Sequence, residues 1–290
     1  MDRIASYAAT RELISTHDLR VKKNLGQNFL VDPFVLEKIA SAADITTDDL
    51  VVEIGPGLGA LTQALLERAG HVVAVELDTR LADILHTTLA DYTNLTILNT
   101  DAQHCDWEGI AKAHGYSSFR AVANLPYYIT TPLIMGLLEG TAPVKSITIM
   151  IQREVAARIL AKPSTRDYGA LTLGVAYRAN ARIVANVPRN CFIPRPGVDS
   201  AVIHLDVLPE PPVQVADECL LFGIIKAAFS QRRKTLVNCI FTIESLSLTK
   251  DAIESMLINC GLDKNVRGEA LCLSQFAVIA NTLHSERCFS

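Results

Sequence analysis

Short apolar runs alternate with longer segments of helical spacing over the first 160 residues. The runs cover residues 50–54, 71–75, 95–98, 119–123 and 145–151. Runs of this length that are apolar almost throughout predict strands buried on both faces, as in a parallel sheet. Between them, apolar residues recur three or four positions apart, which predicts helices. Strands that alternate with helices favour an α/β fold with a doubly wound, parallel sheet.

The helices and the later strands follow from the same pattern. We expect helices at 34–43, 60–68, 81–89 and 106–113, from Thr130 or Thr131 onward, and around 153–160. Asp32 and Pro33 form a strong start signal, since aspartate caps a helix and proline suits its first position. The apolar segments 171–179, 182–187 and 201–207 predict strands that close the sheet with a hairpin. The leader before Asp32 is too irregular for either element, so we expect a loop.

A proline-rich stretch divides the chain. Residues 208–212 read Leu-Pro-Glu-Pro-Pro, which is typical of a linker. Beyond it the spacing predicts helices at 217–229, 235–241, 250–260 and 273–283. We therefore expect a sheet domain over residues 1–207 and a small all-helical domain over residues 213–290.

Composition excludes several classes of protein. The chain has 290 residues, 49% of them hydrophobic, and no apolar run of the roughly 20 residues that a membrane span needs. Its start lacks the apolar core of a signal peptide. The seven cysteines are scattered without a Cys-x-x-Cys pair, which argues against a disulfide framework and against a metal site. We expect a cytoplasmic protein with reduced thiols, no metal and no membrane contact.

The net charge of −4 conceals an uneven distribution. Acidic residues outnumber basic ones over residues 1–140, whereas residues 141–205 are clearly basic. A basic block beside an acidic lobe is typical of a surface that faces phosphates. A solvated face that is rich in arginine by chance is the alternative.

A glycine turn follows the first predicted strand of the sheet. Gly55, Gly57 and Gly59 stand at every second position, and a helical segment begins directly after them. Without Cβ atoms the turn lets a ligand lie against the backbone. Glu76 ends the next strand, where a carboxylate can accept both hydroxyls of a ribose. The spacing does not fit a dinucleotide fold, and Glu53 just before the turn favours a nucleoside without a pyrophosphate, as in S-adenosylmethionine (SAM) methyltransferases. An ordinary tight turn is the alternative.

Four strand-end positions carry residues suited to ligand binding. In a doubly wound sheet, ligands bind outside the carboxyl ends of the strands. We therefore expect one crevice to collect Gly55, Glu76, Asp101 and Asn124. Each of them alone could be a helix cap.

The segment 124–127, Asn-Leu-Pro-Tyr, suggests chemistry on an adenine amine. The Asn124 side-chain carbonyl and the Leu125 backbone carbonyl could accept the two hydrogens of that amine and turn its lone pair toward a methyl donor. Pro126 would stiffen the turn, and Tyr127 would offer a flat face to a flipped base. Two prolines near Phe192 predict an extended backbone that holds its ring out of the core. A buried asparagine that caps a turn, beside a core tyrosine, is the alternative reading.

Together these motifs resemble the KsgA/RsmA family of ribosomal small-subunit adenine dimethyltransferases over nearly the whole chain. The resemblance rests on residues 26–30 (Gly-Gln-Asn-Phe-Leu), 53–57 (Glu-Ile-Gly-Pro-Gly), Glu76, Asp101, 124–127, 192–200 and 229–236. It implies a Rossmann-like domain with a mostly parallel, seven-stranded sheet. Its implied substrate is a pair of adjacent adenosines in a hairpin near the 3′ end of small-subunit rRNA, each dimethylated at N6 late in 30S assembly by a cytoplasmic enzyme.

The resemblance also assigns residues. It implies SAM contacts at Asn28, Leu30, Gly55, Glu76, Asp101 and Asn124, and it makes the leader at 27–28 a lid on the cofactor. The methyl-acceptor set that it implies is Asn124, Leu125, Pro126, Tyr127 and Phe192. We further expect Arg232, Arg233 and Lys234 to meet RNA phosphates, and the protein to act as a monomer. Ser164 departs from the family, which often has glycine there, so the shape of its loop is open.

Other functions share part of this pattern. A resistance-type large-subunit rRNA methyltransferase would have the same cofactor lobe, but the basic segment 231–234 and the helical tail favour the small-subunit family. DNA adenine methyltransferases usually carry proline where this chain has Leu125. A ribosome-assembly factor that has lost catalysis and a nicotinamide dehydrogenase are weaker alternatives.

Overall fold

The computed structural model describes residues 4–19, 27–125 and 127–288, with the backbone alone at 127, 128, 287 and 288. The described residues form two compact units. One comprises the chain up to Ala156 together with Ala181–Val207, and the other comprises Ala157–Asn180 together with the chain from Leu208 onward.

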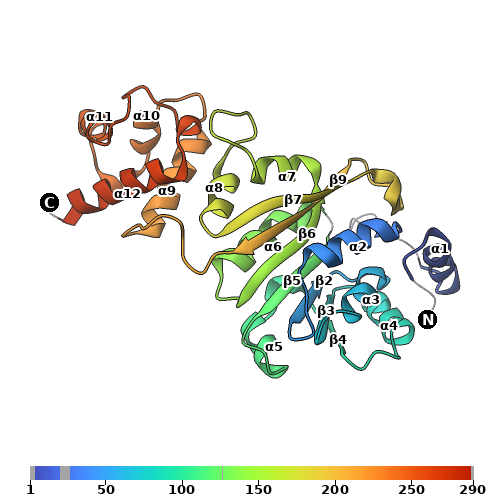
Figure 1. The fold of residues 1–290 in the computed structure, drawn as a ribbon. Coiled ribbons are helices and arrows are strands. Elements are labelled where there is room, and N and C mark those ends of the chain that lie inside the picture. The colour runs from blue at the N-terminus through green and yellow to red at the C-terminus, as the bar shows by residue number, and fades with distance from the viewer. Residues whose placement is uncertain (1–3, 20–26, 126, 289–290) are drawn as a thin grey trace. The chain divides into compact units, whose positions relative to one another are not determined.

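The first unit is built on a seven-stranded sheet of order β4-β3-β2-β5-β6-β9-β7 (Figure 1). Its strands are β2 (Leu50–Ile54), β3 (His71–Glu76), β4 (Leu95–Asn99), β5 (Phe119–Asn124), β6 (Val144–Gln152), β7 (Ala179–Val187) and β9 (Ser200–Val207). The five neighbouring strands β4, β3, β2, β5 and β6 are mutually parallel, and β9 runs antiparallel to β6. The predicted α/β class with a mostly parallel, seven-stranded sheet is confirmed.

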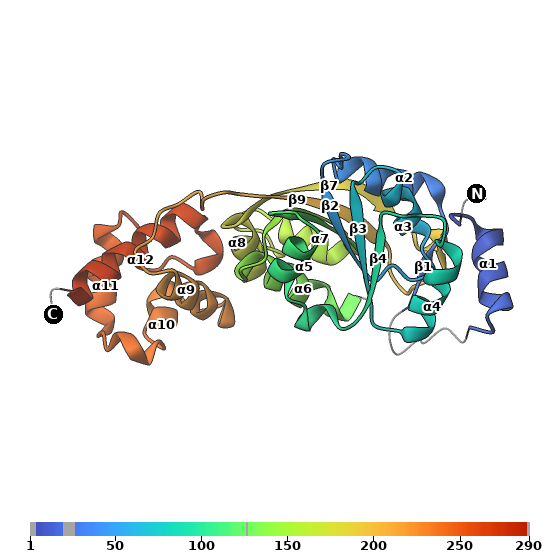
Figure 2. The ribbon, with the colours of Figure 1, turned by 90° about the horizontal axis from the view of Figure 1, so that it is seen from below.

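Helices cover both faces of this sheet. Along the chain they are α2 (Pro33–Ala42), α3 (Ala60–Leu66), α4 (Thr79–Thr88), α5 (Trp107–Ala113), α6 (Tyr127–Glu139) and α7 (Arg153–Ile159). Helices α2 and α3 lie on one face, and α5 and α6 lie on the other (Figure 2). The start signal at Asp32 is confirmed, because its carboxylate accepts from the N–H groups of Phe34 and Val35 and Pro33 opens the helix.

Two predicted elements were wrong. Helix α6 begins at Tyr127 and carries Pro132 in its interior, not near its start. The proline misled the prediction, since its ring usually marks the first helical turn. Segment 171–179 is not a strand, because α8 (Ala170–Ala176) occupies most of it. Its central residues 172–175 are buried, and a short, mostly apolar run does not distinguish a buried helix from a buried strand.

The N-terminal region holds structure that the sequence pattern did not predict. Helix α1 (Tyr7–Thr16) is capped by Ser6, whose side chain accepts from the N–H of Ala9. Strand β1 (Phe29–Leu30) lies within the expected loop and pairs with β8 (Phe192–Ile193) in antiparallel fashion. This pairing fastens the leader to a segment more than 160 residues away in the chain.

The second unit is helical and contains α8, α9 (Glu218–Ser230), α10 (Leu236–Ile240), α11 (Lys250–Asn259) and α12 (Leu273–Cys288). Its core places Tyr168, Leu173 and Tyr177 against residues of the C-terminal helices such as Leu221 and Phe276. The first unit ends at Val207, where we predicted a boundary, but the predicted domain 1–207 also includes residues 157–180, which pack with the second unit. None of the helices in the described parts of the chain is long and apolar enough to cross a membrane.

The helical unit depends on Phe276, whose side chain is fully buried in its core. Replacing it by alanine should lower the free energy of unfolding of this unit by roughly 3–5 kcal/mol, because a large cavity remains. Val278→Ala on the same helix is the matched control, since Val278 is exposed and should change it by less than about 1 kcal/mol. Urea unfolding measures both, and equal losses would contradict this core.

Candidate active site

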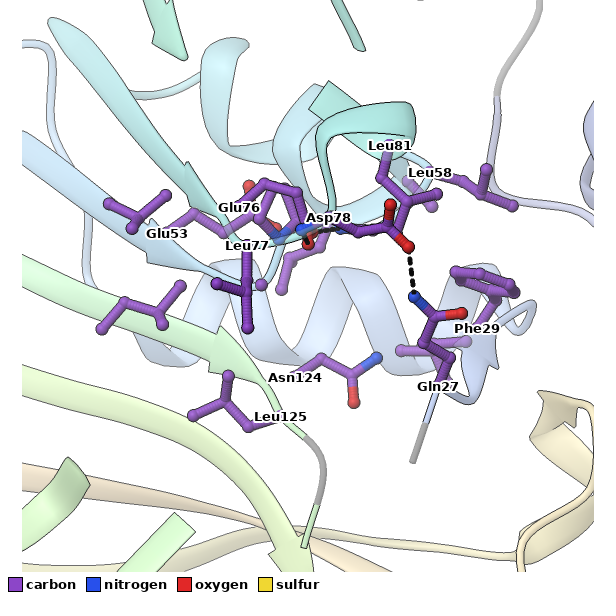
Figure 3. Close-up of a pocket in the computed structure, with 18 of the residues that line it drawn as sticks. Gln27, Phe29, Glu53, Leu58, Glu76, Leu77, Asp78, Leu81, Asn124 and Leu125 are labelled. Atoms are coloured by element: carbon purple, nitrogen blue, oxygen red, sulfur yellow. Dashed lines mark hydrogen bonds between the residues drawn. The ribbon is translucent and has the colours of Figure 1, made fainter. Parts of the chain in front are cut away.

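One pocket lies at the carboxyl ends of β2, β3 and β5. The predicted strand-end residues Gly55, Glu76, Asp101 and Asn124 all line it, so their convergence on one crevice is confirmed. Figure 3 shows Glu76 and Asp78 on one side of the pocket and Asn124 and Leu125 on another. The leader also contributes residues 27–30 to its wall.

Glu76 is the buried acid of this pocket. Its Oε1 accepts from the N–H of Asp78 at 2.9 Å, and its Oε2 accepts from the N–H of Gly57 at 3.2 Å. Burial raises the pKa of Glu76, although these hydrogen bonds oppose the rise. Each oxygen keeps a second lone pair, so the carboxyl group can accept hydrogen bonds from ligand hydroxyls.

The glycine turn lets two neighbouring side chains lie close to its backbone. Gly55 and Gly57 have φ of +70° and +62°, a region that side chains rarely adopt. A Cβ on Gly55 would lie 3.1 Å from Cδ2 of Leu125, and one on Gly57 would lie 3.4 Å from the ring of Phe29. The absence of side chains on the turn therefore allows Leu125 and Phe29 to approach its backbone closely.

The leader is tied to the rim of the pocket at several points. The Gln27 side-chain amide donates to Asp78 Oδ2 at 3.3 Å (Figure 3). Asp78 also caps α4 and pairs with Arg80 at 3.2 Å. Asn28 and Leu30, the leader residues expected to contact the cofactor, both line the pocket.

Among the residues expected at the methyl acceptor, Asn124 and Leu125 line the pocket at the end of β5. Pro126 and the side chain of Tyr127 lie outside the described residues, so their roles stay predictions. Phe192 was expected outside the core, and this was wrong: it is 5% exposed and belongs to the core cluster. Pairing of β8 with β1 turns its ring inward, where it lines the pocket.

Asp101 lies at the end of β4, and its side chain is partly exposed. Its Oδ1 accepts from the N–H of Gln103 at 2.9 Å and so caps a single helical turn, Ala102–His104. Its Oδ2 lies 3.6 Å from His104 Nδ1. Asp101 is therefore a helix cap, as the alternative interpretation held, and it also lines the pocket.

Glu53 lines the pocket, although it was used in the sequence only as part of a motif and was not predicted among the contact residues. It is 1% exposed, and its Oε2 has no hydrogen-bond partner among the described residues. Burial, together with the nearby Glu76 charge, raises its pKa to about 8, while the Thr62 hydroxyl opposes the rise. In the sequence, the feature that indicated a special position was a single carboxyl group within the otherwise apolar strand 50–54.

The three basic residues Arg232, Arg233 and Lys234 of the second unit differ in their contacts. The Arg232 guanidinium donates to the backbone carbonyls of Arg166 at 2.8 Å and Tyr168 at 2.6 Å, and it lies over the ring of Phe229. Arg233 and Lys234 are exposed and form no ion pair within the described chain. Arg232 therefore holds a loop in place, whereas its two neighbours are available to an external partner.

The structure shows the conformation of the loop at Ser164, where the family often has glycine. Ser164 has φ of +65°, and its N–H donates to the Glu269 carbonyl at 2.7 Å. A serine thus adopts the left-handed conformation for which glycine is usually chosen.

The sheet order, the antiparallel pairing of β9 with β6 and the pocket at the strand ends define the α/β methyltransferase fold. Two solved structures have this fold over most of their length. A dimethyladenosine transferase from Plasmodium falciparum superimposes with a TM-score of 0.77 and 26% identity, covering 89% of this chain and 98% of that one. The 23S rRNA methyltransferase ErmE superimposes with a TM-score of 0.68 and 26% identity, covering 88% and 99%.

Sequence comparison identifies the family. Residues 18–284 match the family described as ribosomal RNA adenine dimethylase. Two relatives are called ribosomal RNA small subunit methyltransferase A. The one from Lachnoclostridium phytofermentans is 50% identical over 276 residues, 94% of this chain and 95% of its own length. The one from Alkaliphilus oremlandii is 45% identical over 284 residues, 98% of this chain and 99% of its own. The chain belongs to the ribosomal RNA adenine dimethylase family, which is a family of enzymes.

Because Glu53 has a higher pKa folded than unfolded, its proton stabilises the fold. This contribution is complete below the unfolded pKa of 4.5 and is lost as the pH rises toward 8. We expect the free energy of unfolding of the wild type to fall by on the order of 3 kcal/mol more than that of Glu53→Gln between pH 5 and 8.5. Denaturant unfolding at both pH values measures the difference, and parallel profiles would contradict a buried, neutral Glu53.

Proposed function

We propose that this protein transfers methyl groups from SAM to N6 of two adjacent adenosines in a 3′-terminal hairpin of small-subunit rRNA, as part of 30S maturation in the cytoplasm. The observation that carries the proposal is the single pocket that contains both Glu76 and Asn124. Family membership and the names of relatives that are nearly half identical or more support the reaction and the substrate.

The pocket fits the nucleoside of SAM. The Glu76 carboxyl group has lone pairs for the ribose hydroxyls beyond those that bind Gly57 and Asp78, and the positive φ of Gly55 and Gly57 keeps side chains off the turn. Leu77, which lines the pocket and is 55% exposed, offers an apolar surface to the adenine ring. We assign the remaining cofactor contacts to Asn28, Leu30, Gly55, Asp101 and Asn124. SAM supplies a methyl group already activated by its sulfonium, so the protein has mainly to position its substrates.

The acceptor adenine would meet the end of β5. We assign the Asn124 side-chain carbonyl and the Leu125 backbone carbonyl to the two hydrogens of its amine. Phe192 and Tyr127 would stack against the flipped base, and Pro126 would hold the turn. This arrangement needs neither a nucleophilic side chain nor a metal ion.

The test is transfer of tritium from SAM to 30S particles that lack the modification. Wild-type protein should label them, and Asn124→Ala should reduce the rate by roughly 10²–10³, because a donor–acceptor contact to the reacting group is lost. Asn259→Ala is the control, since Asn259 is exposed in the helical unit. Labelling should map to the 3′-terminal hairpin.

Two results would decide against the proposal. Efficient labelling of 50S but not of 30S particles would favour the large-subunit activity of the kind that the name of ErmE describes. Undiminished labelling by Asn124→Ala would remove the acceptor assignment. An Asn124→Ala protein that still promoted 30S assembly would instead reveal a separate binding role.

Arg233 and Lys234 serve RNA phosphates in this proposal, because both are exposed and unpaired in the described structure. Replacing either by alanine should lower the slope of log affinity against log salt by about one. Lys264→Ala is the control, since Lys264 lies 3.9 Å from Glu254 on the same unit and should leave the slope unchanged. Filter binding to 30S particles across a salt series measures all three slopes, and an unaltered slope in Arg233→Ala and Lys234→Ala would refute their role.

A further inference from the structure

Helix α2 begins with a large aromatic side chain that is exposed. Phe34 is 80% exposed, more than any other large hydrophobic residue in the described parts of the chain. A single exposed apolar residue is ordinary on a protein surface, so its exposure alone carries no function. Its backbone, however, is fixed, because Asp32 Oδ1 accepts from the N–H of Phe34 at 2.9 Å and Pro33 opens the helix. A flat ring on a fixed backbone is suited to stack on a nucleobase.

The start of α2 lies beside the part of the pocket assigned to the acceptor adenine. Leu30, which lines the pocket, precedes Phe34 by four residues, so at most about 14 Å separates their Cα atoms. The Cys191 thiol donates to Asp32 Oδ2 at 3.4 Å, and Cys191 directly precedes Phe192, which also lines the pocket. A base next to the acceptor can therefore reach Phe34 while the acceptor itself is inside the pocket.

The loop that holds Cys191 is basic. Arg189 and Arg195 are both exposed on it. The loop is closed by Arg189, whose N–H donates to Asp199 Oδ1 at 3.1 Å and whose guanidinium donates to the Gly197 carbonyl at 3.4 Å. The Asp199 carboxylate is thus engaged within the loop, and the two arginines give this side of the pocket a positive surface.

The exposed side of α2 has the same character. Lys38 is exposed one helical turn after Phe34, so the two side chains share a face of the helix. Glu37 is the acid beside Lys38, and its carboxylate accepts from the Arg68 guanidinium at 2.7 and 2.8 Å. An aromatic face flanked by cations complements a nucleic-acid strand, in which flat bases alternate with phosphates.

We propose that Phe34 positions the rRNA substrate by stacking on a base that flanks the acceptor adenosine. The inference rests on the proposed function, in which the acceptor lies beside Phe192 and is one of two adjacent adenosines. While one base is in the pocket, its neighbour is held outside it, and the ring of Phe34 offers that neighbour a flat surface. Phe34 lines neither the cofactor pocket nor the assigned amine site, so it is a positioning residue.

The test compares KM and kcat for tritium transfer from SAM to 30S particles that lack the modification. Phe34→Ala should raise KM for the particles roughly 5- to 100-fold, which is the loss expected for one stacked base. It should leave kcat unchanged, because the acceptor still reaches the same site. Phe34→Trp, which keeps a flat face, should behave like wild type, whereas Phe34→Leu, which is apolar but not flat, should behave like Phe34→Ala. Tyr7→Ala is the matched control, since Tyr7 is an exposed aromatic residue on α1, and it should leave KM unchanged.

Two further measurements separate positioning of RNA from a structural role. Phe34→Ala should unfold at the wild-type temperature and should bind S-adenosylhomocysteine, the demethylated product, with wild-type affinity. An unchanged KM in Phe34→Ala, an equal loss in Phe34→Trp, a lower kcat at unchanged KM, or weaker binding of S-adenosylhomocysteine would each overturn the inference. If wild-type protein failed to methylate the particles at all, the proposed function would fall first. An active wild type whose KM did not respond to Phe34→Ala would overturn this inference alone.

Discussion

The buried carboxyl group of Glu76 is the interaction on which the pocket depends. Its two oxygens bind the N–H of Gly57 in the glycine turn and the N–H of Asp78 at the start of α4. Asp78 in turn accepts from Gln27 of the leader. One side chain therefore connects the sheet edge, the turn, a helix and the segment that lies over them, and the ligand surface is shaped before any ligand arrives.

A second carboxyl group, that of Glu53, is buried in the same pocket. Glu53 and Glu76 are both buried, and each has a pKa above its ordinary value chiefly because burial disfavours charge. Burial therefore lowers the negative charge that the two acids bring into the cavity, and Glu53 in particular is neutral below about pH 8. Both side chains still offer polar atoms to a ligand that forms hydrogen bonds.

The sequence predicted the sheet and the strand-end residues well, because short apolar runs and the shared carboxyl edge of parallel strands leave few arrangements. The predictions from sequence were wrong where contacts between distant segments determine the conformation. Residues 170–176 form a helix whose central residues 172–175 are buried, which the apolar pattern alone does not distinguish from a buried strand. Phe192 faces inward because β8 pairs with the distant β1. The burial of Glu53 and its unpaired Oε2 were not predicted, because an unpaired buried group is visible only in three dimensions. Arg232 was expected to contact RNA phosphates like Arg233 and Lys234, because a run of basic residues does not show which side chain binds a loop of the protein itself.

The helical unit takes part of its core from the middle of the chain. Tyr168, Leu173 and Tyr177 precede β7 in the sequence, yet they pack with helices that follow Val207. Ending translation at the proline-rich linker would therefore not release an independent catalytic fragment. It would leave three large side chains without their covering helices, and such a surface promotes aggregation. Removing the tail would therefore also expose part of residues 157–180, which lie before the linker.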